Sequence, residues 1–327
     1  MMYCLSLGWC ENMQEVTYSD VQSAAERLDG VVSKTPVISS EEIDRLAGRS
    51  VFMKCENLQH VGAFKFRGAS NAVILLEEEG DSGICTHSSG NHGQAVALAA
   101  KQRGIPAYIV MPKTAPRVKI EGVKSHGAEV ILCEPTLEAR ITTANSVLDR
   151  TGAYFIHPFD NHNVIAGQGT AAKEMIEECG SLDAVLAPIG GGGLMSGTSI
   201  STRALLPNAQ IFGTEPYGAD DAAKSLESGE FVPQTGPDTI CDGLLTSMGE
   251  ITWPIIKSHV EQIIRVSDED VLKAMTILNE VFDMIVEPSG AISLAAVLKD
   301  EFVEKEGIDR IGIILCGGNV DQEKLPF

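Results

Sequence analysis

Short runs of β-branched residues alternate with amphipathic segments along this 327-residue chain, and the alternation limits the fold to few classes. Apolar runs bounded by turn residues are typical of buried strands, and apolar residues spaced three to four positions apart indicate helices. Their alternation predicts an α/β fold with parallel-type sheets flanked by helices. Strands are predicted at residues 51–55, 84–87, 107–111, 130–133, 154–157, 184–189, 210–214 and 312–315. Helices are predicted at 94–103, 137–150, 166–179, 194–206 and 268–282, among others.

The number of strands favours two smaller sheets over one large sheet. At roughly 150 residues per domain, the length also suggests about two domains. Ligands of such folds bind at the carboxyl ends of the strands, where loops lead into helix N-termini. The loops that follow the strands are therefore the places to look for functional residues.

The charge excludes some functions. The formal net charge is −20, from 45 acidic and 25 basic residues, and such a surface repels nucleic acid. No apolar run approaches the roughly 20 residues of a membrane span, so no membrane partner is expected. An anionic ligand must be bound locally, by backbone amides or a single basic side chain.

The eight cysteines have no CxxC pair and no paired spacing. In a chain of this length they are typical of reduced thiols rather than of disulfides or a zinc site. The N-terminal residues 1–11 lack the basic and apolar regions of a signal peptide. We therefore expect a cytoplasmic protein.

A run of four glycines follows one predicted strand and opens a helix: Gly190, Gly191, Gly192 and Gly193. Their amides can face a phosphate without help from a basic side chain, although the run could also be a simple turn. A dinucleotide fingerprint fits less well, because Ser196 stands where glycine or alanine is required. Glu215, at the end of the next strand, could still imitate the ribose-binding acid. A nicotinamide enzyme therefore remains an alternative.

A second loop contains small polar residues beside two glycines: Ser88, Ser89, Asn91 and His92. At the positive end of a helix, these groups could hold a carboxylate, and Ser89 could move a proton. The other interpretation is an ordinary helix N-cap made from serine and asparagine.

Lys65 lies between Phe64 and Phe66, so desolvation should lower its pKa and leave some nucleophilic amine that can form a Schiff base. Alternatively, it is a surface lysine whose stem covers apolar neighbours. Cys316 ends a buried strand and precedes two glycines, where a flat ring could approach the backbone. A strand-ending turn explains that pattern equally well.

Taken together, these loops resemble the fold-type II pyridoxal-phosphate enzymes, and within them the serine racemase and serine/threonine dehydratase branch. The resemblance implies a fold like that of the tryptophan synthase β subunit. It extends from about residue 17 to residue 321. It is carried, in order, by the motifs GAFKFRGA, THSSGNHGQA, IPAYIVMPKTAP, IAGQGT, PIGGGG, EPYGADDA, DGLLTSMG, TWPII, EPSGA and CGGNVD.

The resemblance implies roles for the loop residues. Lys65 would form the internal aldimine with pyridoxal phosphate and move the α-proton on one face, with Ser89 as the acid/base on the opposite face. The loop from Ser88 to His92 would hold the substrate carboxylate, and Asn91 would contact the pyridoxal 3-oxygen. The cofactor phosphate would bind Gly190, Gly191, Gly192 and Gly193.

Cys316 would face the pyridine nitrogen, where relatives usually have serine. A thiol is a weak hydrogen-bond donor, so the cofactor should be a moderate electron sink. That property suits elimination of a β-hydroxyl group.

The resemblance also implies a divalent-metal site and contacts to the far end of the substrate. Glu215, Asp221 and the Ala219 carbonyl would bind Mg²⁺ (or Ca²⁺ or Mn²⁺), unless this is only a solvated acidic loop. Arg140 and Thr246 would face the substrate side chain, and the arginine could pair with a second carboxylate. Arg140 could also be an ordinary helix-surface arginine.

The expected enzyme is a serine racemase with L-serine and L-threonine dehydratase activity on a small hydroxy amino acid. The alternatives are a threo-3-hydroxyaspartate dehydratase or a dedicated threonine/serine dehydratase, and, in other classes, a nicotinamide oxidoreductase or a non-catalytic binder. A homodimer is expected. The large domain would comprise residues 1–82 and 161–327, and the small mobile domain residues 83–160.

Overall fold

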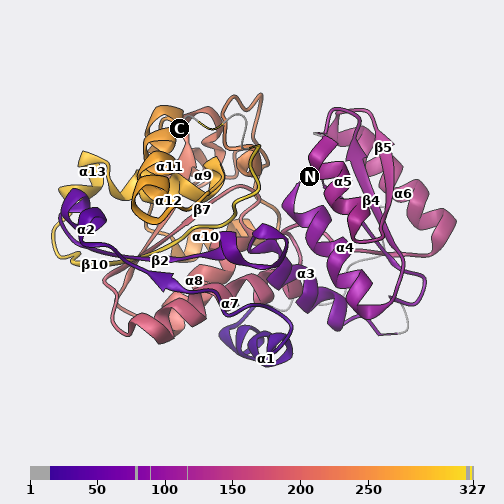
Figure 1. Ribbon diagram of the computed structural model, residues 1–327, viewed down its shortest axis with the longest axis horizontal. Coiled ribbons are helices and arrows are strands. Elements are labelled where there is room, and N and C mark those ends of the chain that lie inside the picture. The colour runs from indigo at the N-terminus through magenta and orange to yellow at the C-terminus, as the bar shows by residue number, and fades with distance from the viewer. Residues whose placement is uncertain (1–14, 78–79, 89, 116, 322–324, 326–327) are drawn as a thin grey trace.

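The protein consists of two α/β units that lie side by side in Figure 1, each built on its own sheet. The computed structural model describes residues 15–77, 80–88, 90–115, 117–321 and 325. We call the two parts the six-stranded unit and the four-stranded unit, after their sheets. The predicted α/β class and the division into two sheets are confirmed.

The larger sheet has the strand order β1-β2-β10-β7-β8-β9. Only β1 pairs antiparallel with its neighbour, and the other pairs are parallel. β10 lies between β2 and β7, so Figure 1 shows the indigo strand β2 beside the yellow strand β10. The strands are β1 (Val37–Ile38), β2 (Ser50–Lys54), β7 (Ala184–Pro188), β8 (Gln210–Pro216), β9 (Gln262–Val266) and β10 (Arg310–Ile314).

The smaller sheet is parallel throughout, in the order β5-β4-β3-β6. Its strands are β3 (Ile84–His87), β4 (Ala107–Pro112), β5 (Glu129–Cys133) and β6 (Tyr154–Phe155). All eight predicted strands are present, with ends that differ by at most two residues. β1 and β9 were not predicted.

Helices cover the sheets, and in Figure 1 α11 and α12 lie above β2 and β10 while α7 and α8 lie below them. The α-helices are α1 (Tyr18–Leu28), α2 (Glu41–Ala47), α3 (Lys65–Ile74), α4 (Asn91–Arg103), α5 (Arg117–Ser125), α6 (Leu137–Thr151), α7 (His162–Cys179), α8 (Gly193–Leu205), α9 (Asp221–Ser228), α10 (Thr252–His259), α11 (Asp268–Phe282), α12 (Pro288–Val297) and α13 (Asp300–Val303). Short 3₁₀ turns are η1 (Glu56–Leu58), η2 (His60–Gly62), η4 (Tyr217–Ala219) and η5 (Asp242–Leu244). No helix in the described part of the chain is both long enough and apolar enough to cross a membrane.

Local chemistry explains where several helices begin and end. The Thr136 side chain accepts a hydrogen bond from the backbone of Ala139 at the start of α6, and Gly152 ends that helix with φ of 70°. A capping box between Ser267 and Asp270 opens α11. Such caps satisfy backbone groups that a helix leaves unpaired at its ends.

α3 joins the two units, because it packs against α4 on one side and α7 on the other. Phe66 and Val73 of α3 belong to the same buried cluster as Ile84 and Ala95 of the four-stranded unit. The beginning of α3 is therefore fixed at the boundary between the units, and this boundary contains the candidate site.

Candidate active site

Lys65 is the first residue of α3. Its Nζ atom donates a 2.8 Å hydrogen bond to the carbonyl oxygen of Pro158 and lies 5.1 Å from the centre of the Phe64 ring. Burial lowers the pKa of Lys65 to about 8, although the nearby Cys316 thiol opposes this shift. The direction agrees with the expectation from its aromatic neighbours. Part of the Lys65 population is therefore neutral amine, the nucleophilic form, near neutral pH.

The backbone before Lys65 is held by the loop that follows β10. The Phe64 N–H donates a 3.0 Å hydrogen bond to the carbonyl oxygen of Cys316, and Ala63 forms an isolated β-bridge with Gly317. α3 has no side-chain N-cap, so these contacts fix its first turn instead. They also bring Lys65 and Cys316, which are far apart in the sequence, to the same place.

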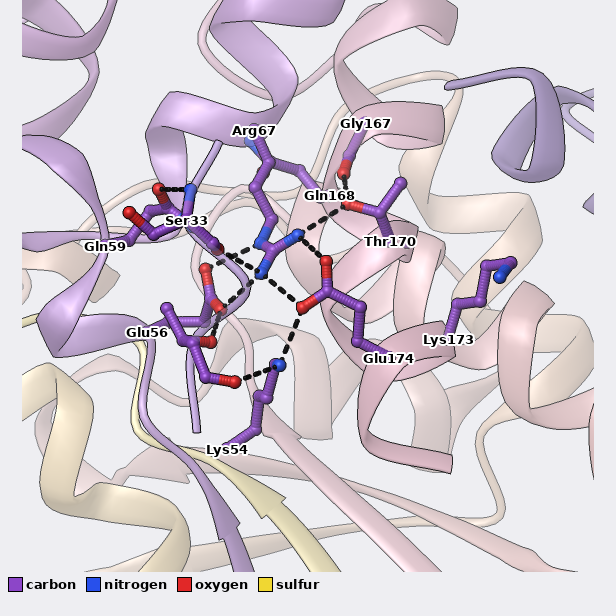
Figure 2. Close-up of polar contacts among 12 residues, drawn as sticks. Ser33, Lys54, Glu56, Gln59, Arg67, Gly167, Gln168, Thr170, Lys173 and Glu174 are labelled. Atoms are coloured by element: carbon purple, nitrogen blue, oxygen red, sulfur yellow. Dashed lines mark hydrogen bonds and ion pairs between the residues drawn. The ribbon is translucent and has the colours of Figure 1, made fainter. Parts of the chain in front are cut away.

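Two residues after Lys65, the guanidinium of Arg67 is fully buried in a network of ion pairs (Figure 2). It donates to both carboxylate oxygens of Glu56, at 2.8 and 2.9 Å, and to both of Glu174, at 2.7 and 2.8 Å. Lys54 adds a second cation 2.7 Å from Glu174. Residues two apart on a helix point to nearly opposite sides. Arg67 therefore fastens one side of α3 to the six-stranded unit, and Lys65 faces the other way.

The four consecutive glycines, Gly190, Gly191, Gly192 and Gly193, connect β7 to α8 and include the first residue of that helix; we call them the tetraglycine loop. Gly192 adopts φ of 87° and is the N-cap of α8, which has no side-chain cap. A Cβ atom on Gly191 would lie 2.2 Å from the Phe159 ring, and one on Gly190 would lie 2.9 Å from the Gly243 carbonyl oxygen. The loop has no room for side chains, and the uncapped start of α8 offers backbone N–H groups to an anion. These features fit a phosphate group.

The second predicted loop joins β3 to α4. Ser89 lies outside the described residues. The Ser88 hydroxyl accepts a 3.3 Å hydrogen bond from the Gly90 backbone, and no side chain among the described residues caps the start of α4 at Asn91. The ordinary N-cap interpretation is therefore wrong for Asn91. The N–H groups at the start of α4 suit a carboxylate.

His92, in the first turn of α4, is buried. Burial lowers its pKa well below the usual value, and the positive charge of Lys65 adds to the shift. His92 is therefore a neutral imidazole beside this loop.

Asn91 does not point freely into the loop. Its Nδ2 donates a 2.8 Å hydrogen bond to Glu287, and its Oδ1 accepts a 2.9 Å hydrogen bond from Asn319. The Glu287 carboxyl also accepts the Asn319 backbone N–H at 3.1 Å and lies directly over Gly317, where a Cβ atom would be 2.4 Å from Oε1. These contacts connect the start of α4 to the loop after β10.

Glu287 and Asn319 are site residues that the sequence interpretation missed. Burial raises the pKa of Glu287 to about 7, with a further increase from the charge of Asp242. The available signal was an acidic residue directly before Pro288 and an apolar helix, because an acid at the start of a helix that is buried from Ser289 to Val297 must itself lie near the interior.

Cys316 is buried, and its Sγ donates to the carbonyl oxygen of Ser289 at 3.2 Å. Burial raises its pKa well above the usual value, with a contribution from Glu287. Cys316 is therefore a thiol and not a thiolate. As a neutral, weak donor, it fits a contact with an unprotonated ring nitrogen.

In the described part of the chain, no hydrogen bond or ion pair joins Arg140 to Thr246. Arg140 lies in the first turn of α6. Burial lowers the pKa of His87 at the end of β3, and the positive charge of Arg140 adds to the shift. Its Nε atom is buried without a hydrogen-bond partner in the described part of the chain. Thr246 is exposed in the loop after η5. Arg140 thus lies at the carboxyl edge of the smaller sheet with donor capacity left over.

The end of β8 and the start of α9, on either side of the acidic loop after β8, bring two carboxyl groups together. Glu215 is buried and accepts hydrogen bonds from the backbone N–H groups of Ala222 and Ala223, at 3.1 and 2.8 Å. Burial raises its pKa well above the usual value, and the charge of Asp221 adds to the shift. Asp221 Oδ2 is buried with no hydrogen-bond partner in the described residues.

Ala219, in η4 between these acids, is also buried. The residues that the structure describes contain no cluster of three or more His, Cys, Asp or Glu side chains suited to a metal. A cation at this place would bind two carboxylates, a backbone carbonyl and water, a donor set that hard divalent cations accept. The unpaired Asp221 oxygen fits such a cation.

Comparison with known proteins identifies the class. Residues 28–317 match the family model described as "Pyridoxal-phosphate dependent enzyme". The chain therefore belongs to the pyridoxal-phosphate-dependent enzymes, and its two parallel-type sheets have the fold-type II arrangement of that family.

Individual relatives narrow the class to a branch. The chain is 48% identical to the serine racemase of Dictyostelium discoideum over 314 residues, which is 95% of this chain and 97% of that protein. It is 43% identical to a beta-hydroxyaspartate dehydratase of Paracoccus denitrificans, over 95% of this chain and 98% of that protein. The structure of maize serine racemase matches with a TM-score of 0.94 and 43% identity, over 95% of this chain and 96% of that one. The chain is thus an enzyme of the serine racemase and dehydratase branch.

These findings decide between the classes that the sequence left open. The nicotinamide oxidoreductase and the non-catalytic binder are both wrong, because the chain belongs to a pyridoxal-phosphate enzyme branch over nearly its whole length.

Proposed function

We propose that the protein is a serine racemase that also dehydrates L-serine and L-threonine. The observation that carries the proposal is the Lys65 amine, whose pKa is lowered to about 8 and which is held by a carbonyl oxygen rather than by an acid. An amine in this state can act both as a nucleophile toward an aldehyde and as a base. The serine racemases among the relatives support the substrate.

Pyridoxal phosphate, when bound, supplies the electron sink that makes the α-hydrogen of an amino acid acidic. The tetraglycine loop and the start of α8 would bind its phosphate, Asn91 would face its phenolic oxygen, and Cys316 would face its ring nitrogen. The amides at the start of α4, with Ser88, Asn91 and His92, would hold the substrate carboxylate.

Proton transfer would then use residues on two sides of the substrate. Lys65 Nζ would remove the α-proton on one face. For racemisation, the Ser89 hydroxyl would deliver a proton to the opposite face, which inverts the configuration. For dehydration, the same α-proton would be lost together with the β-hydroxyl group as water, and hydrolysis would give a keto acid and ammonia.

The metal belongs to this proposal. Mg²⁺ (or Ca²⁺ or Mn²⁺) would bind Glu215, Asp221 and the Ala219 carbonyl. Support comes from the two raised carboxyl pKa values and from the buried Asp221 oxygen without a partner. A divalent cation would remove the repulsion between these acids and would fix the start of α9.

A second substrate is favoured by Arg140. Its buried Nε has no hydrogen-bond partner among the described residues. An arginine can bind the second carboxylate of a substrate through two parallel hydrogen bonds. Dehydration of L-threo-3-hydroxyaspartate, with Thr246 also near the substrate side chain, is therefore the alternative function. Relatives named for this activity support it.

The quaternary and domain arrangement is proposed as well. Residues 83–160 would form a small mobile domain that closes over the substrate against a large domain of residues 1–82 and 161–327. The enzyme would be a cytoplasmic homodimer. Lys119 of α5 and Asp242 of η5 form an ion pair between the four-stranded and six-stranded units, which is the kind of contact a closed state needs.

Product analysis tests the function. The purified enzyme, supplied with pyridoxal phosphate and Mg²⁺, is incubated with L-serine, L-threonine and L-threo-3-hydroxyaspartate, and both D-amino acid and keto acid are measured. D-serine that disappears in Ser89→Ala, while keto acid from L-serine persists, supports the racemase.

Keto acid alone, formed fastest from hydroxyaspartate, would overturn the racemase in favour of the alternative. In that case Arg140→Met should raise KM for hydroxyaspartate far more than for serine. Arg150→Met, on the exposed last turn of the same helix, serves as its matched control.

A further inference from the structure

The segment that returns from β6 to α7 touches several parts of the site within four residues. The Pro158 carbonyl accepts the hydrogen bond from Lys65, and the ring of the next residue, Phe159, packs against the tetraglycine loop. His157 Nδ1 accepts the Asp160 backbone N–H at 2.9 Å. Asp160 itself has no part in the function proposed above.

The Asp160 carboxylate binds the N-terminus of α10. Its Oδ1 accepts the N–H groups of Ile251 and Thr252, at 2.9 and 3.2 Å, and its Oδ2 accepts that of Glu250 at 3.0 Å. α10 has no cap from its own N-cap residue. Gly249 is needed here, because a Cβ atom would lie 2.2 Å from Oδ1. A residue from another part of the chain thus caps α10.

The first residue of α10 continues the contact to the tetraglycine loop. The Thr252 hydroxyl accepts the Gly249 N–H at 2.8 Å and donates to the carbonyl oxygen of Gly191 at 2.8 Å. Its Cβ would lie 2.9 Å from a Cβ on Gly192, the residue with positive φ. Asp160 therefore acts on α10, and α10 acts directly on the loop.

The buried carboxylate of Asp160 also bears on the tetraglycine loop. Burial raises its pKa, and three backbone N–H groups counteract that cost. Burying a carboxylate costs solvation free energy, and hydrogen bonds to the carboxylate must offset that cost. Because its neighbour Phe159 presses on Gly191 from one side and Thr252 holds Gly191 from the other, the segment and α10 together fix the loop.

We propose that Asp160 is a positioning residue for the phosphate group of the cofactor, acting through Thr252 on Gly191. The inference rests on the proposed binding of that phosphate by the tetraglycine loop. It predicts that loss of Asp160 weakens recognition of the phosphate specifically. A purely structural cap would affect every ligand of the site equally.

The test compares pyridoxal phosphate with pyridoxal, which lacks the phosphate. Dissociation constants for both are measured on the full-length apoprotein by fluorescence titration, and their ratio reports recognition of the phosphate. We define this ratio as the dissociation constant of pyridoxal divided by that of pyridoxal phosphate. We expect it to fall about tenfold in Asp160→Ala and about threefold in Thr252→Val, which corresponds to the loss of one or two hydrogen bonds. Thr252→Ser, which keeps the hydroxyl, should restore it.

Asp270→Ala is the matched control, because it also removes a carboxylate from a helix start but lies at α11. Its ratio should equal that of the wild type. Thr252→Val and Thr252→Ser test the same link if Asp160→Ala does not fold. Equal weakening of both ligands, or an unchanged ratio in folded Asp160→Ala and Thr252→Val, would overturn the inference. A wild-type protein that does not prefer pyridoxal phosphate over pyridoxal would instead contradict the proposed phosphate site.

Discussion

The amine of Lys65 and the carbonyl oxygen of Pro158 lie 2.8 Å apart. Lys65 begins the helix that joins the two units, and Pro158 belongs to the segment that returns from the four-stranded sheet. A carbonyl oxygen accepts a hydrogen bond from an ammonium group as well as from a neutral amine. The contact therefore orients Lys65 without fixing its protonation state, which burial controls.

Uptake of pyridoxal phosphate by the apoprotein should depend on pH. Because the pKa of Lys65 is lowered to about 8, the neutral amine is the minor form below this pH and the major form above it. We expect the rate to increase roughly tenfold per pH unit below about pH 8 and to level off above it. The change in absorbance after rapid mixing with pyridoxal phosphate measures this rate. Lys65→Ala is the control, because it should show no such absorbance change. A midpoint near the ordinary lysine value would contradict it.

Removal of the buried guanidinium should strongly destabilise the fold. Arg67→Met leaves the carboxylates of Glu56 and Glu174 with too few partners, and we expect a loss of about 3–5 kcal/mol in the free energy of unfolding. Arg67→Lys should lose less, because it keeps the charge but not the forked geometry. Urea denaturation measures both.

The control for Arg67 is Arg45→Ala. Arg45 is exposed and lies 3.9 Å from Glu42, so its loss should change the stability by less than about 0.5 kcal/mol. If Arg67→Met lowers the free energy of unfolding as little as Arg45→Ala does, the ion-pair network contributes little to stability.

Divalent cations should stabilise the enzyme through the acidic loop. At a Mg²⁺ concentration of 100 times the dissociation constant, the gain is about 2.7 kcal/mol, and EDTA should reverse it. Glu215→Gln and Asp221→Asn should remove the effect, and Glu230→Gln, an exposed acid nearby, should retain it. Chemical denaturation with and without the metal measures this. Equal stabilisation of all four proteins would place the cation elsewhere.

The ion pair between Lys119 and Asp242 should favour the closed arrangement of the two units. Lys119→Met and Asp242→Asn should each raise KM roughly two- to fivefold, and the double variant should be no worse than either single variant. High salt should reduce the difference in KM between these variants and the wild type, because it screens the ion pair.

The matched control is the pair of Lys113 and Glu134, which is exposed and lies within the four-stranded unit. Its removal should leave KM unchanged. Additive effects of Lys119→Met and Asp242→Asn would show that the two residues act independently.

Local sequence pointed to the loops, although it left a simple turn and a surface lysine open as alternatives. Four glycines after a strand predict a backbone anion site, and the Phe-Lys-Phe run predicts a desolvated amine, because both properties depend on adjacent residues. The strand β9 was missed because Gln262 and Arg265 interrupt its apolar pattern. In the structure, the partly exposed Arg265 side chain pairs with Asp220 and Glu227.

Contacts between distant residues could not be predicted in the same way. Glu287 meets Asn91 across 196 positions, Glu174 meets Arg67 across 107, and Asp160 meets Ile251 across 91. Each of these side chains is ordinary in its local context. Their partners are defined only when the sheets bring separate loops together.

The position of β10 affects the order in which the chain can fold during synthesis. Arg310 pairs with Ser50, and β10 also supports β7, so the centre of the larger sheet is missing until the last strand leaves the ribosome. The four-stranded sheet, by contrast, is complete once residue 155 has emerged. The nascent chain must therefore keep the unpaired edges of β2 and β7 from aggregating while the smaller unit is already able to form.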